Sequence, residues 1–138
     1  MTSPFADLLA ANRSYAEGFA LGDLTGLAAK ELAVLTCIDS RIEPLSMLGL
    51  QPGEAKIVRN AGAQVTGEAL RSLEVAAQRL SVRRIMVVAH TDCAMSPTEA
   101  AVRADVERLR NSDEMPAGTI VAGFFYDVKT GLLHPLDG

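Results

Sequence analysis

The hydrophobic residues change their spacing several times along the chain. Three segments carry apolar residues at intervals of three and four, which is the spacing of amphipathic helices. These predicted helices cover residues 4–17, 68–80 and 97–111. Short apolar runs without alternation lie between them and are typical of strands that are covered on both faces. These predicted strands are ELAVLTC at 31–37, AKIVRN at 55–60 and RIMVVAH at 84–90.

Weaker signals complete the predicted order of elements. A short helix is expected in EPLSMLGL at 43–50, and two β-rich runs around residues 127–131 predict a hairpin-like pair of strands. Strands that alternate with helices form βαβ units with right-handed crossovers. The sequence therefore predicts an α/β fold with a mainly parallel sheet of about four to five strands, flanked by helices.

Length and composition predict one globular domain over residues 1–138, because 49% of the residues are hydrophobic and only 22% are charged. The net charge of -4, without a basic cluster, argues against nucleic acid as a partner. The apolar runs are too short to cross a membrane. The N-terminal residues lack the cationic and apolar regions of a secretory signal, so a cytoplasmic location is expected.

Two of the predicted strands end in side chains that bind metals. Cys37 ends the first strand, His90 ends the third, and Cys93 follows three residues later. Ligand sites in parallel sheets collect at the carboxyl ends of the strands. Two thiolates and one imidazole form a ligand set for Zn²⁺ that leaves the fourth position to water. One cysteine alone is more often an inert buried thiol, but the three residues together predict a zinc site.

Asp39 and Arg41 are candidate functional groups beside that site. Asp39 can accept a hydrogen bond from zinc-bound hydroxide and orient it, while Arg41 can hold the carboxylate away from the metal. The alternative is that Asp39 and Ser40 cap the next helix and that Arg41 only neutralises the charge. Asp92 is expected to be a solvated or loop-capping carboxylate, and His134 a surface residue.

Three motifs in the chain resemble the β-class carbonic anhydrases, particularly the short members of that family. The motifs are CIDSR at 37–41, RNAGAQVT at 59–66 and HTDC at 90–93. The resemblance is strongest between Val34 and Met95, and GFFYDVKTGLL at 123–133 is similar to the last strand of the family. The motifs are specific because they rarely occur together at this separation.

The resemblance implies a set of site residues and a reaction. The implied zinc ligands are Cys37, His90 and Cys93, and the implied catalytic pair is Asp39 and Arg41. The implied reaction is the reversible hydration of carbon dioxide to bicarbonate by metal-bound hydroxide. The resemblance also implies a homodimer or a higher homo-oligomer, in which an N-terminal arm packs its helix on the neighbouring subunit. This arm corresponds to residues 1–29.

Two departures from the family pattern concern the pocket. Ala94 stands where the family usually has glycine, and the segment 96–117 is shorter than in many relatives. The choice of substrate therefore stays open between carbon dioxide and either carbonyl sulfide or carbon disulfide. Two non-catalytic states of the metal site also stay open. In the first, Asp39 remains bound to the metal in a zinc protein without activity. In the second, Cys37 and Cys93 form a disulfide that expels the metal.

Overall fold

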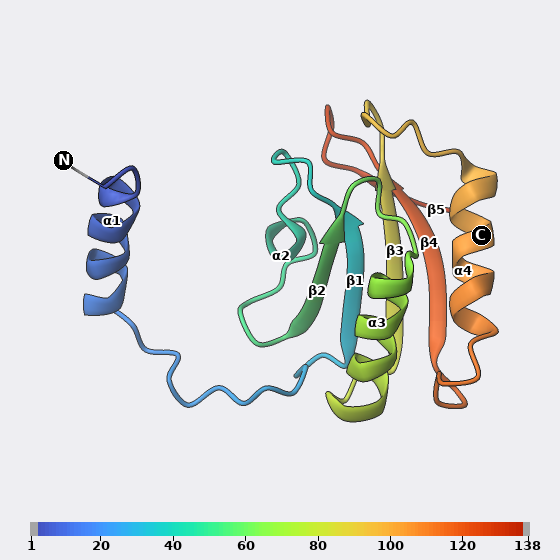
Figure 1. The fold of residues 1–138 in the computed structure, drawn as a ribbon, viewed down its shortest axis with the longest axis horizontal. Coiled ribbons are helices and arrows are strands. Elements are labelled where there is room, and N and C mark those ends of the chain that lie inside the picture. The colour runs from blue at the N-terminus through green and yellow to red at the C-terminus, as the bar shows by residue number, and fades with distance from the viewer. Residues whose placement is uncertain (1–2, 137–138) are drawn as a thin grey trace.

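A computed structural model describes residues 3–136 as a five-stranded sheet with helices on both of its faces (Figure 1). The elements in chain order are α1 (Ala6–Glu17), β1 (Leu32–Cys37), α2 (Pro44–Met47), β2 (Ala55–Asn60), α3 (Gly67–Arg79), β3 (Arg84–His90), α4 (Glu99–Arg110), β4 (Ile120–Tyr126) and β5 (Leu133–Pro135). The strand order is β2-β1-β3-β4-β5, and only β5 runs antiparallel to its neighbour. The predicted α/β fold is confirmed.

Strand β1 lies in the interior of the sheet and is buried along its whole length. This burial explains its continuous apolar sequence, because a strand covered on both faces has no solvent side on which polar residues would be favoured. Its polar residue Thr36 is fully buried and donates a hydrogen bond to the carbonyl oxygen of Val88 at 3.0 Å. That bond satisfies a hydroxyl that would otherwise be costly to bury.

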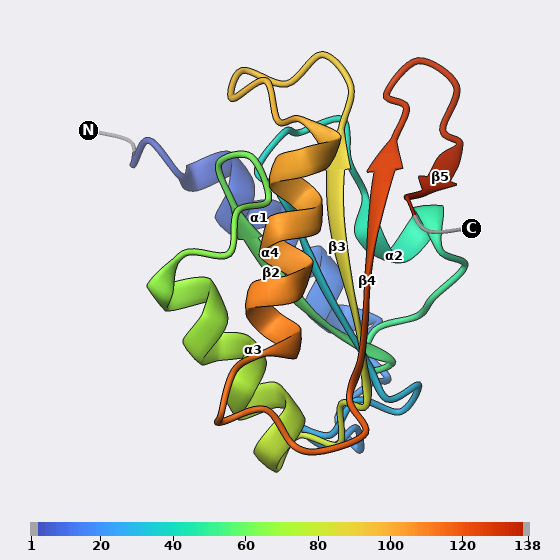
Figure 2. The same cartoon turned by 90° about the vertical axis from the view of Figure 1, so that its right-hand side faces the viewer.

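The two faces of the sheet are covered to different extents. Helices α3 and α4 cover one face, and their apolar stripes, including Leu73 and Leu109, complete the larger core with β1 and β3 (Figure 2). The opposite face has only the short helix α2 and the chain after it, and its smaller cluster centres on Val34 and Val88. A groove of about 360 Å³ on this face is lined by Leu48 and other apolar residues.

Helix α4 starts at a different cap residue from the one that the sequence pattern suggests. Ser96 fits the start of a capping box, but Thr98 is the N-cap of α4 and accepts a hydrogen bond from the amide of Ala101 at 3.1 Å. Ser96 instead has a left-handed φ of 45°. The chain has to turn away from β3 before the helix starts, so the helix begins two residues later than the sequence pattern predicts.

Helix α1 stands apart from the rest of the molecule, at the end of an extended segment (Figure 1). It contains no buried residue, and its large apolar side chains, such as Leu8 and Tyr15, are 61% and 60% exposed. The rings of Tyr15 and Phe19 contact each other with centroids 5.7 Å apart. Within residues 3–136, every helix is too short or too polar to cross a membrane.

Candidate metal centre

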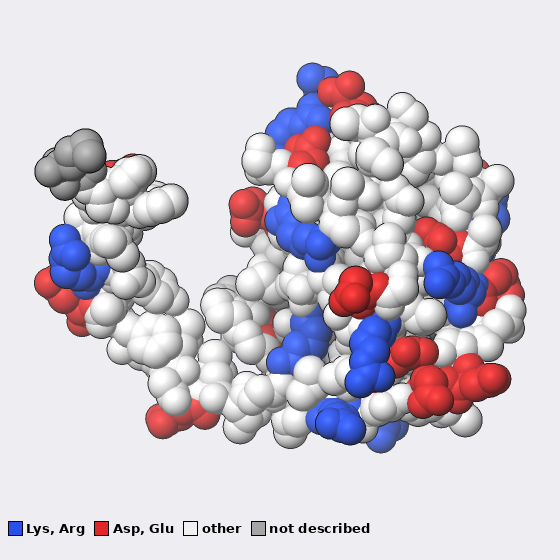
Figure 3. Space-filling model, viewed as in Figure 1, with Lys and Arg blue, Asp and Glu red and all other residues white. Residues whose placement is uncertain are grey.

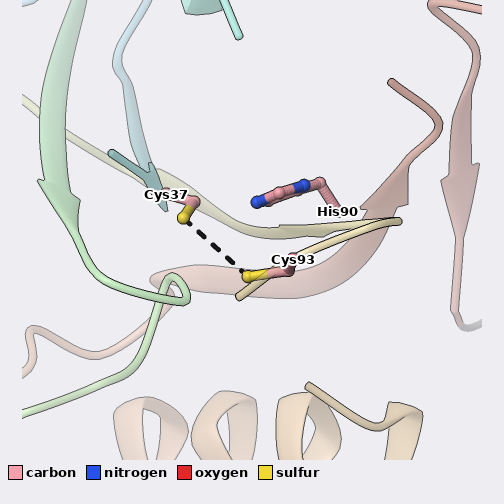
Figure 4. A group of neighbouring side chains, drawn as sticks. All are labelled: Cys37, His90 and Cys93. Atoms are coloured by element: carbon pink, nitrogen blue, oxygen red, sulfur yellow. Dashed lines mark hydrogen bonds between the residues drawn. The ribbon is translucent and has the colours of Figure 1, made fainter. Parts of the chain in front are cut away.

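Cys37, His90 and Cys93 meet at the carboxyl ends of the two adjacent strands β1 and β3 (Figure 4). Their candidate ligand atoms all lie within 4.8 Å of one another, and the two Sγ atoms are 4.0 Å apart. Cys37 is the last residue of β1 and His90 the last of β3, whereas Cys93 belongs to the loop that follows. The parallel ladder between these strands therefore brings together three residues that lie up to 56 positions apart.

The His90 side chain is buried and is oriented by its own loop. Its Nδ1 lies 2.6 Å from the carbonyl oxygen of Thr91, which can only accept a hydrogen bond. Nδ1 therefore donates this hydrogen bond, and in the neutral imidazole the lone pair is on Nε2. Among the described residues, Nε2 has no hydrogen-bond partner although it is buried. A buried lone pair without a donor is unfavourable in a purely structural histidine, but it suits a metal ligand.

Backbone amides point at both sulfur atoms. The amide of Gly62 donates to Sγ of Cys37 at 3.3 Å, and the amide of Met95 donates to Sγ of Cys93 at 3.4 Å. Burial by itself would raise the pKa of Cys37, but hydrogen bonds outweigh it and lower this pKa to about 7, chiefly those from the backbone of Gly62 and Asp39. Burial raises the pKa of Cys93, and the nearby Cys37 adds to the effect. The Cys37 thiol therefore loses its proton more readily than the Cys93 thiol.

Asp39 and Arg41 form a bidentate ion pair beside the cluster. Arg41 donates from Nε to Oδ1 of Asp39 at 3.0 Å and from Nη2 to Oδ2 at 2.7 Å, and its backbone amide also donates to Oδ1. These hydrogen bonds from Arg41 hold the pKa of Asp39 far below its ordinary value. Oδ2 lies only 3.9 Å from Nε2 of His90, so this carboxylate is next to the cluster while Arg41 engages it.

The sequence motif around Arg59 braces the loop that carries this ion pair. Arg59 donates to three backbone carbonyl oxygens, those of Cys37 at 2.8 Å, Asp39 at 2.8 Å and Ile42 at 3.2 Å. The side chain of Asn60 also closes the following loop through two hydrogen bonds with the backbone of Gln64. The motif residues Arg59 and Asn60 thus fix the backbone near the cluster.

Gly62 occupies a position where a larger residue would not fit. Its φ is +83°, which favours glycine, and a Cβ built there would lie 2.9 Å from Cβ of Met95. Its amide can therefore approach Cys37 closely. Ala94, the other position that bears on loop geometry, causes no such strain, because the left-handed residues of its loop are Asp92 and Ser96.

Asp92 is exposed, as the sequence led us to expect, but its carboxylate also binds Arg41. Nη1 of Arg41 donates to Oδ2 of Asp92 at 3.0 Å, and Nη2 donates to its carbonyl oxygen at 3.1 Å. The two residues are 51 positions apart, so no local pattern in the sequence indicates the contact. His134 is exposed in β5, as expected.

A cavity of about 140 Å³ opens beside the cluster. Cys37, His90, Cys93 and Asp39 supply its polar atoms, and its apolar walls come from Ile38, Ala61, Ala94 and Met95. A cavity of about 390 Å³ adjoins it and shares Gly62 and Met95. Although larger, this second cavity contains none of the three candidate ligands. The smaller cavity therefore combines the reactive groups with room for a small molecule.

Comparisons with known proteins agree with this geometry. The family model described as carbonic anhydrase matches residues 32–115. Beta-carbonic anhydrase 1 of Mycobacterium tuberculosis is 33% identical over 155 residues, which cover 93% of this chain and 94% of that protein. A carbon disulfide hydrolase of an Acidianus species is 42% identical over 80 residues, covering 57% of this chain and 39% of that protein.

The solved structures lead to the same family. The crystal structure of a carbonic anhydrase from Streptococcus mutans superposes with a TM-score of 0.89 and 31% identity, and the match covers 99% of each chain. The resemblance inferred from the three sequence motifs is thus confirmed, together with the fold that it implied and the enzyme class. The chain belongs to the β-class carbonic anhydrase family.

Proposed function

We propose that this protein catalyses the reversible hydration of carbon dioxide to bicarbonate and that it depends on one zinc ion. The observation that carries the proposal is the convergence of Cys37, His90 and Cys93 beside the Asp39–Arg41 pair, within a small cavity. Membership of the β-class carbonic anhydrases supports the same reaction. The zinc ligands and the roles of Asp39 and Arg41 are part of this proposal.

The residues present fit a zinc ion. His90 offers a buried Nε2 lone pair without a partner among residues 3–136, and two sulfur atoms lie near it. Two thiolates and one imidazole are a known ligand set of catalytic zinc. When bound there, zinc is a Lewis acid that makes water acidic enough to act as a nucleophile near neutral pH.

The chain's own residues orient the reactants. Asp39, held by Arg41, accepts a hydrogen bond from the attacking water and so directs the oxygen lone pair at the carbon of the substrate. The side chains of Ile38 and Met95 give carbon dioxide an apolar wall, which suits a molecule without a net dipole. As the new carbon–oxygen bond forms, one proton of the water leaves to solvent, and bicarbonate is the product.

Stopped-flow measurement of carbon dioxide hydration tests the proposal. Zinc-loaded protein should show saturable hydration, a chelator should abolish it, and added zinc should restore it. A matched control is His134→Ala, because this exposed histidine lies outside the cluster and its loss should leave the rate unchanged. Protein that binds one zinc ion per chain but hydrates carbon dioxide no faster than buffer would contradict the proposal.

Hydrolysis of carbon disulfide or carbonyl sulfide is the second candidate, and the 42% identity to a carbon disulfide hydrolase over 80 residues favours it. Both molecules are linear and electrophilic at carbon, so the same water and the same Asp39 orientation would serve. Release of hydrogen sulfide, measured beside carbon dioxide hydration on one zinc-loaded sample, separates the two functions. The larger kcat/KM identifies the preferred substrate.

We also propose that residues 1–29 form an arm that packs on a second copy of the chain, giving at least a homodimer. The exposed apolar side chains of α1, including Leu8 and Leu9, are left without cover in one chain. Charged residues lie mainly on the outer side of this arm, and the side that faces the body is mostly uncharged (Figure 3). The two free cysteines suit a reducing compartment, so we propose a cytoplasmic location.

A further inference from the structure

We propose that Asp92 is a positioning residue that anchors Arg41 and thereby keeps Asp39 aimed into the cavity and away from the metal. The inference rests on the proposed function, in which Asp39 orients the attacking water. It assigns a role to the third residue of the HTDC motif, which carries two of the proposed ligands at its ends.

Arg41 donates hydrogen bonds to both Asp39 and Asp92. Two guanidinium nitrogens bind Asp39, and the remaining nitrogen, Nη1, donates to Oδ2 of Asp92 at 3.0 Å. Nη2 also donates to the carbonyl oxygen of Asp92 at 3.1 Å. The guanidinium is therefore held on two sides, and its plane is fixed relative to the loop that follows His90 and contributes Cys93.

The exposure of these groups shows that stability is not the main effect of the contact. The side chain of Asp92 is 69% exposed and that of Arg41 is 39% exposed. Ion pairs in contact with solvent contribute little to folding, because water competes for both charges. A contact that stabilises weakly can still restrict a long side chain to one orientation, since arginine has several rotatable bonds.

Orientation matters here because Asp39 lies next to the metal ligands. Its Oδ2 is 3.9 Å from Nε2 of His90, so a modest rotation would bring the carboxylate among the donor atoms. A carboxylate is itself a zinc ligand, and there it would take the position that water needs. The ion pair with Arg41 opposes this rotation only while the guanidinium itself stays in place. The hydrogen bonds from Arg41 to Asp92 keep it there.

The backbone of Asp92 determines which variants are informative. Its φ is +52°, in the left-handed region that asparagine and glycine tolerate better than alanine. Asp92→Gly therefore removes the carboxylate without adding strain, and Asp92→Asn keeps an oxygen that can accept from Arg41. Asp113→Asn serves as the matched control. Asp113 is exposed in the loop after α4, and its substitution removes the same charge as the substitutions of Asp92.

The experiment measures zinc content, hydration kinetics and the visible spectrum of cobalt-substituted protein for each variant. Asp92→Gly should bind one metal ion per chain but show kcat per bound zinc reduced about tenfold, as is typical when a partner of the site residues is lost. Its cobalt spectrum should shift, because Asp39 now binds the metal. Asp92→Asn should recover most of the rate, and Asp113→Asn should match the wild type.

A double variant isolates the route of the effect. If Asp92 acts through Asp39, the cobalt spectrum of Asp39→Asn should not change when Asp92→Gly is added, because no carboxylate remains to bind the metal. An Asp92→Gly protein with unchanged kcat per zinc and an unchanged spectrum would overturn the inference, whatever its thermal stability. If wild-type protein does not hydrate carbon dioxide, the proposed function fails, but the cobalt spectra still decide the role of Asp92.

Discussion

The carboxyl ends of the strands and the N-terminal arm differ in how far their side chains are held by contacts within one chain. At the strand ends, most polar groups are held by hydrogen bonds, and Arg59 alone donates to three carbonyl oxygens. In the arm, helix α1 has no buried residue, and its apolar side chains lie in solvent. The comparison teaches that one chain brings together the candidate groups for a metal site, whereas the apolar side chains of its arm stay uncovered.

Removal of a proposed ligand should have the largest effect on the strand ends. In Cys37→Ser the donor set has one thiolate fewer, so we expect loss of tightly bound zinc and a hydration rate that falls to background. Metal analysis after dialysis, together with stopped-flow assays, checks this. Circular dichroism should show that the fold persists, because the sheet and both of its cores do not depend on the thiol. Full zinc retention would remove Cys37 from the ligand set.

A change beside the ligands should be nearly as damaging but selective. Asp39→Asn keeps the size of the side chain but weakens the bidentate pair with Arg41, and it changes the acceptor proposed for the attacking water. We expect kcat to fall about 100-fold while one zinc ion per chain remains bound. Hydration kinetics normalised to metal content provide the measurement. Undiminished kcat in this variant would favour the interpretation in which Arg41 only neutralises the charge of Asp39. The other part of that alternative, a cap on the next helix, is wrong, because the N-cap of α2 is Glu43.

The arm can be tested through its apolar surface. The double change Leu8→Asp and Leu9→Asp places two charges on side chains that are 61% and 53% exposed in one chain. If these side chains are covered by a second copy, light scattering after size-exclusion chromatography should show dissociation toward monomers. Arg13→Glu, a charge change at an exposed position of the same helix, should leave the oligomer largely intact. An unchanged mass for the double variant would argue against the proposed arm contact.

The smallest expected effect is on the pH dependence of the metal-free protein. The pKa of Cys37 is lowered to about 7 in the folded state, whereas the pKa of a cysteine in the unfolded chain is about 8.5. This thiol therefore stabilises the fold fully above the unfolded pKa, and the contribution is lost as pH falls through about 7. We expect the contribution of Cys37 to the free energy of unfolding to rise by about 1.5 kcal/mol between pH 6 and pH 8.5. Urea titrations with a chelator measure it, and Cys37→Ser should show a smaller rise.

The fold could be predicted from the sequence because its determinants are local. AKIVRN and RIMVVAH become strands with the predicted bounds. The prediction that both are covered on both faces is wrong for AKIVRN, because β2 lies at the edge of the sheet and is only half-buried. Helix α4 begins later than predicted, because both Ser96 and Thr98 suit a cap and only the path of the chain after β3 selects Thr98.

The site was predictable only in part. Cys37 and His90 end two predicted strands, and parallel pairing necessarily brings such ends to one edge, so their proximity followed from the fold class. The contact between Arg41 and Asp92 did not, because it joins two loops whose conformations depend on the assembled sheet. The three carbonyl oxygens that accept from Arg59 could not be predicted from the sequence either, because any residue has a backbone carbonyl. The roles of the proposed ligands and of Asp39 and Arg41 stay predictions until activity is measured.

The adjacency of β1 and β3 has a consequence for how the protein would acquire the proposed ion. These strands are joined by their own hydrogen-bonded ladder and are packed on both faces, so the ladder itself holds the ends of β1 and β3, where Cys37 and His90 lie, side by side. Little reorganisation then accompanies metal uptake, and stripping followed by reconstitution should be reversible without refolding. The sheet would then hold the proposed ligands in place without the ion, in contrast to small zinc domains, which are unfolded without theirs.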